Sequence, residues 1–132
     1  MRREFALLAA LLVTIAPIRA HHGSAGFDQN RPLHFTGKVS QVEWSNPHIV
    51  VRVEASNATW LVNTLPPNTA KRLGFTQNDF APGVEVTVDG YQATDGSNHV
   101  NGTSIRLPGG KQITSAACFE PSPYCFGSAA LK

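Results

Sequence analysis

The sequence predicts a mainly-β fold, namely a five-stranded OB-like barrel with one short helix between the third and fourth strands. Three observations carry this prediction. Apolar and polar residues alternate over five short segments, which is the period of a half-buried strand. The first of these segments is long enough to bend, and a single helix candidate follows the third. A small immunoglobulin-like sandwich is the competing architecture, but it would leave the helix unexplained.

The first predicted strand changes its buried face partway along. Apolar residues keep one parity from Leu33 to Val39 and take the other parity at Val42 and Trp44. A half-buried strand can change parity only by inserting an extra residue, so we expect a β-bulge near residues 40–41. A long strand bent in this way is what a small barrel needs to turn its corner.

Four further segments complete the predicted barrel. They are residues 48–55 (HIVVRVEA), 59–65 (TWLVNTL), 84–90 (VEVTVDG) and 99–107 (HVNGTSIRL), and residues 111–114 could add a short edge. The third of these four alternates most cleanly. Its valines are expected to point inward. The residues that alternate with them are expected to point outward: Glu85, Thr87 and Asp89.

Residues 67–75 (PNTAKRLGF) are the helix candidate. A proline stands at the start and Gly74 is a natural C-terminal cap. Thr76 and Asp79 have capping spacing and could open a further short turn. A turn is also expected at Ser45-Asn46-Pro47, because Pro47 cannot donate a hydrogen bond to a strand ladder.

Residues 1–20 have the layout of a secretory signal peptide. A basic start is followed by an apolar run of about eleven residues, well short of the roughly 20 that span a bilayer. We expect cleavage after Ala20, with Ala25 as the rival position and with a twin-arginine route as an alternative to general secretion. The mature protein is then periplasmic or secreted, carries no membrane anchor, and comes from a bacterium.

The expected domain division follows from this cleavage. Residues 21–32 form an extended N-terminal segment, 33–115 the barrel, and 116–132 a C-terminal tail. Cys118 and Cys125 lie in the tail, where an exported protein is expected to form a disulfide bond, although a thiolate metal site is the alternative.

Charge argues against a nucleic-acid partner. The whole chain has a net charge of +2, but the leader removes three arginines and one glutamate. Residues 21–132 then hold eight basic and eight acidic residues. No block of Lys or Arg remains that could bind a phosphate backbone by counterion release. The oligomeric state is left open.

Three histidines form the predicted metal site: His21, His22 and His48. After cleavage at Ala20, His21 offers its terminal amine and its imidazole to one ion. His48, fixed by Pro47, would supply a second imidazole and His22 an alternative one. A nitrogen-rich set of this kind suits Cu(II) best among the divalent ions. The competing interpretation is a tail that binds nothing specific, with His48 hydrogen-bonded to a turn.

The remaining polar and aromatic residues predict little chemistry. No phosphate loop, nucleophile elbow or HExxH motif is present, so no enzyme activity is expected. His34 is expected to be exposed and His99 to lie in a loop. The carboxylates that alternate with core residues are expected on solvated strand faces: Glu43, Glu54, Glu85 and Asp89. The alternative function is an envelope binding module for a protein, glycan or small ligand, with these aromatics on one barrel face: Trp44, Trp60 and Tyr91.

Residues 20–113 resemble a family of small exported bacterial proteins of uncharacterised function. The resemblance rests on the segments AHHGSAGFD, TGKVSQVEWSNPHIVVRVE, RLGFTQNDFAPGVEVTVDGYQATDGS and LPGGKQI, with the Trp44–His48 element as its most specific part. His21, His22 and His48 match family positions. Gly23 stands where the family usually has Ser, Glu85 follows Val84 in place of the Gly-Asp spacing, and the cysteine tail is extra. The resemblance implies no activity.

Overall fold

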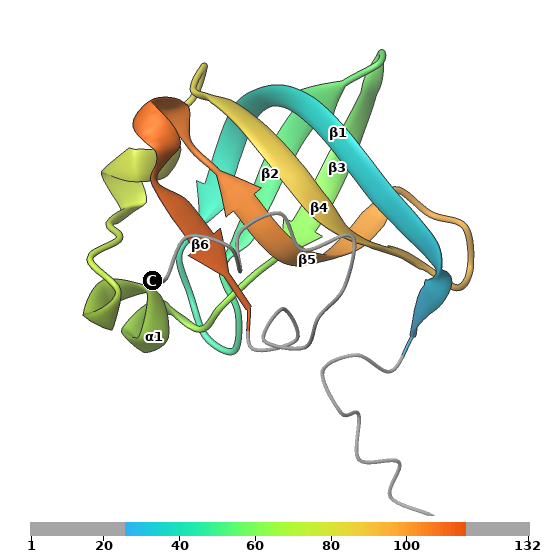
Figure 1. Cartoon of the computed structure of the whole chain (residues 1–132), viewed down its shortest axis with the longest axis horizontal. Coiled ribbons are helices and arrows are strands. Elements are labelled where there is room, and N and C mark those ends of the chain that lie inside the picture. Colours follow the sequence, from blue (N-terminus) through green and yellow to red (C-terminus); the bar gives the residue numbers. More distant parts are fainter. Residues whose placement is uncertain (1–25, 116–132) are drawn as a thin grey trace, which may run out of the picture.

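The computed structural model describes residues 26–115 (Figure 1). The predicted leader, His21, His22 and both cysteines lie outside these residues. Within them, six strands, one α-helix and two 3₁₀ turns follow one another: β1 (Phe27–Glu43), β2 (Val50–Ala55), β3 (Ala58–Asn63), α1 (Pro67–Arg72), η1 (Gln77–Phe80), β4 (Glu85–Ala93), β5 (His99–Arg106), η2 (Pro108–Gly110) and β6 (Gln112–Thr114). No helix in this part of the chain is long and apolar enough to cross a membrane.

The strands form one mainly antiparallel sheet in the order β3-β2-β1-β4-β5-β6. An additional parallel pairing between β3 and β5 joins the two sides of this sheet, so that β1 to β5 form a ring of strands. The mainly-β class and the helix after β3 are as predicted. The prediction of five strands was short by one, because residues 112–114 pair with β5 as a sixth strand.

β1 is the strand on which the ring depends, because it pairs with both β2 and β4. Its pairing with β2 shifts between Val39 and Gln41, which confirms the predicted bulge. At Gly37 a Cβ atom would lie 2.5 Å from the carbonyl oxygen of Glu54, so only glycine allows β1 and β2 to approach this closely. β1 begins at Phe27, six residues before the start that the alternating pattern suggested.

The interior is filled by β-branched residues from every large strand. Val51 and Val53 of β2 and Val62 of β3 are fully buried, as are Val88 and Ile105 on β4 and β5. They alternate with outward-facing residues, as the period of two requires. Burying these side chains supplies the main driving force for closing the ring.

The helical elements α1 and η1 lie at one end of the ring, on the left in Figure 1, and Lys111 links the residues between and within them. Lys111 Nζ lies 3.0 Å from both carboxylate oxygens of Asp79 and 2.8 Å from the carbonyl oxygen of Gly74, over the ring of Phe75. Asp79 also accepts a hydrogen bond from the Thr76 amide at 2.7 Å. The bond from Thr76 and the nearby Lys111 ammonium hold the pKa of Asp79 below its ordinary value of 3.8.

Candidate functional site

His48 lies in the loop that joins β1 to β2. The Asn46–Pro47 peptide bond immediately before it is cis. The next residue, Ile49, is fully buried, and its backbone forms hydrogen bonds with Thr64 and Leu65. The Pro47 ring restricts the backbone before His48, and the hydrogen bonds of Ile49 hold the backbone after it.

The His48 side chain is half-buried and makes no hydrogen bond to any residue between 26 and 115. The competing interpretation, a hydrogen bond from His48 to a turn carbonyl, is therefore not found among the described residues. Its imidazole nitrogens remain available to a ligand. Nearby, Trp44 packs against the buried Phe80 of η1, with 6.2 Å between ring centroids, and so anchors the start of the same loop.

The described chain begins beside the start of β5. The Phe27 ring packs edge-on against that of His99, with 5.3 Å between centroids. His99 Nε2 lies 3.0 Å from Asn63 Oδ1, and Asn63 is the register partner of Val50, two residues after His48. His99 was expected to open the strand over residues 99–107 and also to lie in a loop. It is the first residue of β5, because its backbone pairs with Leu61 of β3, so the loop assignment was wrong.

The length of chain before Phe27 limits where an N-terminal ligand can lie. An extended chain covers about 3.3–3.6 Å per residue, so the six steps from His21 to Phe27 span at most roughly 20 Å. A site shared by His21 and His48 therefore requires His48 to lie within this span of Phe27.

His21 and His22 lie outside the described residues, so the structure neither brings them to His48 nor separates them from it. Between residues 26 and 115, no group of three or more His, Cys, Asp or Glu side chains could hold a metal ion by itself. A site centred on His48 would need ligands from the rest of the chain.

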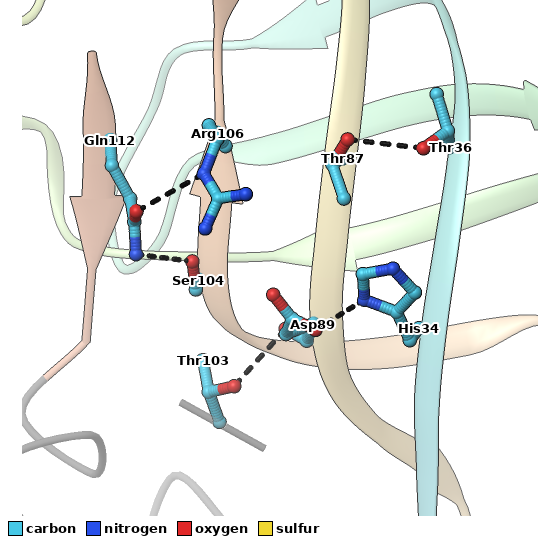
Figure 2. Close-up of polar contacts among 8 residues, drawn as sticks. All are labelled: His34, Thr36, Thr87, Asp89, Thr103, Ser104, Arg106 and Gln112. Atoms are coloured by element: carbon cyan, nitrogen blue, oxygen red, sulfur yellow. Dashed lines mark hydrogen bonds and ion pairs between the residues drawn. The ribbon is translucent and has the colours of Figure 1, made fainter. Parts of the chain in front are cut away.

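A second polar cluster, which the sequence did not predict, lies on the outer side of the sheet (Figure 2). His34 Nδ1 and Asp89 Oδ1 are 2.6 Å apart. The His34 side chain is 58% exposed, as expected, but the Asp89 side chain is only 4% exposed. The prediction that Asp89 lies on a solvated strand face was therefore wrong, whereas Glu43, Glu54 and Glu85 are exposed.

The β4–β5 pairing explains part of this difference. The register shifts after Asp89, so that Asp89 pairs with Ser104 and Gly90 with Gly102. The residue left over, Thr103, is buried and donates a hydrogen bond from its hydroxyl to the Asp89 carbonyl oxygen at 3.1 Å. The only sequence signal was the Asp-Gly pair, which is more typical of a turn than of a bulge.

Eight residues from four adjacent strands make up what we call the polar face. Two rows follow the strand register from β1 through β4 and β5 to β6: His34, Asp89, Ser104 and Thr114, then Thr36, Thr87, Arg106 and Gln112. Gln112 Nε2 donates to Ser104 Oγ at 2.8 Å, and the hydroxyls of Thr36 and Thr87 are 3.0 Å apart. Most side chains of this face are thus linked to a neighbour across the strands (Figure 2).

One small open pocket adjoins the polar face. It has a volume of about 160 Å³ and is lined by these residues: Glu85, Thr87, Arg106, Leu107 and Pro108. Its single carboxylate and single guanidinium give it no clear preference for an anion or a cation.

The aromatic residues pack as parts of the interior more than as a common surface. Trp60 packs against Phe35, with 5.1 Å between ring centroids, whereas Trp44 packs against Phe80. Both tryptophans are partly buried against the hydrophobic core. Nothing in the described contacts gathers Trp44, Trp60 and Tyr91 into one groove.

The chain belongs to DUF6152, a family of unknown function, whose model matches residues 9–103. This match covers the β1–β2 loop with His48 and half of the polar face, namely His34, Thr36, Thr87 and Asp89. No curated protein and no solved structure matches the chain.

Proposed function

We propose that this member of the DUF6152 family is an exported, non-catalytic copper-binding protein. The terminal amine and the imidazole of His21 would chelate the ion, His48 would supply a second imidazole, and His22 would act as an alternative ligand. The set is rich in nitrogen, which favours Cu(II) among the divalent ions. Handling, storage or delivery of the metal, without turnover, is the corresponding role.

One observation carries the proposal: His48 lies between Pro47 and the buried, hydrogen-bonded Ile49, and its side chain has no hydrogen-bond partner among the described residues. A ligand on a rigid element loses little conformational entropy when it binds, so its contribution to affinity is larger. A histidine that is already hydrogen-bonded within the fold would have to break that bond before it could bind the ion.

We also propose that the ring of strands is a five-stranded OB-like barrel with β6 added outside it. The cyclic neighbour order β1-β2-β3-β5-β4, the bend in β1 and the helix after β3 all support this architecture. Export to the periplasm or beyond the cell follows from the leader-like residues 1–20 and would leave His21 as the first residue.

Copper titration of the protein purified from the periplasm tests the function. The intact mass first identifies the N-terminus, and competition with a chromophoric chelator then gives the Cu(II) affinity. We expect a mature start at His21 and at least a tenfold loss of affinity in His21→Ala and in His48→Gln. His34→Gln is the matched control, because its ring is paired with Asp89, and it should leave the affinity unchanged.

Two results would contradict the proposal. One is a mature chain that starts at Gly26, because both N-terminal histidines would then be lost. The other is an equal Cu(II) affinity in wild type, His21→Ala and His48→Gln.

A further inference from the structure

Two side chains of the polar face are buried although they point away from the hydrophobic interior. Asp89 follows the core residue Val88 on β4, and Ser104 precedes the core residue Ile105 on β5. Alternation along a strand places both on the outer side of the sheet. Yet Asp89 is 3% exposed and Ser104 is 2% exposed, in contrast to the exposed Thr36 on the same face.

Flanking strands do not account for this burial. Neighbouring strands cover the edges of a strand, whereas its outer side chains stay open unless another layer lies over them. Among residues 26–115, α1 lies at the left of the ring in Figure 1, and the described chain offers no second layer over the polar face. At Asp89 and Ser104 the outer side of β4 and β5 therefore has the burial of a covered surface, whereas Arg106 in the second row is exposed.

We propose that residues 116–132, the C-terminal segment of this same chain, dock on the polar face. The chain leaves the sheet at the edge of that face: Thr114 belongs to its first row, and the Ser115 amide donates to the Thr103 carbonyl oxygen at 2.9 Å. The segment that follows is long enough to cross four strands, since they lie about 4.8 Å apart and an extended residue covers about 3.3 Å.

The composition of this segment fits the role. Only Glu120 and Lys132 of its seventeen residues are charged, and three aromatic residues are present: Phe119, Tyr124 and Phe126. Segments that stay solvated are typically rich in charge and poor in aromatics, which is the opposite composition. Glu120 also gives the segment a carboxylate that complements the guanidinium of Arg106 and the imidazole of His34.

The predicted Cys118–Cys125 bond would help the segment to dock. A closed loop has fewer conformations to lose on binding than an open chain of the same length. The docking does not depend on copper, because neither His21 nor His48 belongs to the polar face. In this proposal the tail covers Asp89 and Ser104, the two buried residues of the polar face.

Site-specific photo-crosslinking in the complete mature chain tests the docking. A benzophenone amino acid replaces Thr36, which is exposed on the polar face, and in a matched variant replaces Thr59, which is exposed on β3. After irradiation, peptide mass spectrometry identifies the crosslinked residues. A mixture of ¹⁵N-labelled and unlabelled chains distinguishes bonds within one chain from bonds between two.

We expect crosslinks from position 36 to residues 116–132 of the same chain, at least tenfold more abundant than those from position 59. Crosslinks from position 36 mainly to a second chain would overturn the proposal in favour of a dimer interface. An absence of crosslinks to residues 116–132, or equal yields at both positions, would also overturn it. None of these outcomes changes the copper affinities that test the proposed function.

Discussion

His48 and His34 differ in every feature that decides what a histidine can do. His48 lies between Pro47 and the buried, hydrogen-bonded Ile49, but its ring has no hydrogen-bond partner between residues 26 and 115. His34 is on a strand, and its ring is held by the buried carboxylate of Asp89. The first arrangement leaves binding capacity for a ligand, whereas the second uses it within the fold.

The same contrast extends to the surrounding structure. On the polar face, hydrogen bonds link side chains of neighbouring strands, and two polar side chains are buried. Little space is left around these two for a different side chain. In the loop with His48 the backbone is held in place, but the His48 side chain makes no hydrogen bond within the described residues and can be replaced without losing one. Replacing the buried Asp89 should therefore be costly for stability, and replacing His48 nearly neutral. The four predictions below run from the largest expected effect to the smallest, and they include one substitution in the β4–β5 pairing and one in η1.

Gly90→Ala should have the largest effect. A Cβ at this position would lie 2.4 Å from the Asn101 carbonyl oxygen and 2.6 Å from a methyl of Val100. The strands β4 and β5 would have to separate, so we expect a loss of about 3 kcal/mol in the free energy of unfolding. Urea denaturation measures it. Thr87→Ala on the same strand is the control, with an expected loss of about 0.5 kcal/mol; similar losses in both variants would refute the tight β4–β5 approach.

Asp89→Asn should cost about 1–2 kcal/mol. The amide keeps an oxygen that can accept from His34 but loses the charge that strengthens the bond. The same urea experiment in a His34→Gln background completes a double-mutant cycle. We expect a smaller loss there, because the partner is already gone. Equal losses in both backgrounds would show that the 2.6 Å contact does not contribute to stability.

Asp79→Asn should cost about 1 kcal/mol at pH 7, since it weakens the bonds to Thr76 and Lys111. The folded-state pKa of Asp79 is lowered, so its contribution is complete above the unfolded pKa near 3.8 and is lost as pH falls through the folded value. The stability difference between wild type and variant should therefore shrink below about pH 4. Thermal melts from pH 7 to pH 3 measure it, and a difference that stays constant would contradict the assignment.

His48→Gln should have the smallest effect on stability, within about 0.5 kcal/mol of wild type. The side chain has no hydrogen bond to lose inside the described structure, and the backbone is held by Pro47 and Ile49. Thermal unfolding of the metal-free protein checks this. A loss above 1 kcal/mol would mean that His48 has a structural role, and the contrast with His34 would then disappear.

Much of the fold was predictable because strand periodicity is local. Alternating valines set the buried faces of β2 and β4, and the change of parity between Val39 and Val42 located the bulge in β1. Gly74, with φ +83°, ends the helical segment as predicted. The extent of β1 before Leu33 was missed, since residues 27–32 show no period and owe their strand geometry to β4.

The candidate sites divide in the same way. His48 was chosen from its place after Pro47, and in the structure two backbone hydrogen bonds hold the next residue, Ile49. Its role as a metal ligand stays a prediction. Asp89 was assigned to a solvated face because it alternates with core residues. Alternation along one strand shows only that a side chain points away from the core. Whether that side is covered depends on residues that are distant in the sequence. His99 was likewise placed in a loop, because its strand pairing comes from Leu61, 38 positions earlier.

The sequence by itself determined the strand faces, the bulge, the helix and the choice of histidines as candidate ligands, because each depends on neighbours within a few residues. Only the tertiary structure decided that β3 and β5 close the ring, that His34 is paired with a buried Asp89, and that His48 is left without a partner in residues 26–115. The physical reason is that the strands next to a side chain set its hydrogen bonds and its burial. Which strands become neighbours depends on residues far apart in the sequence.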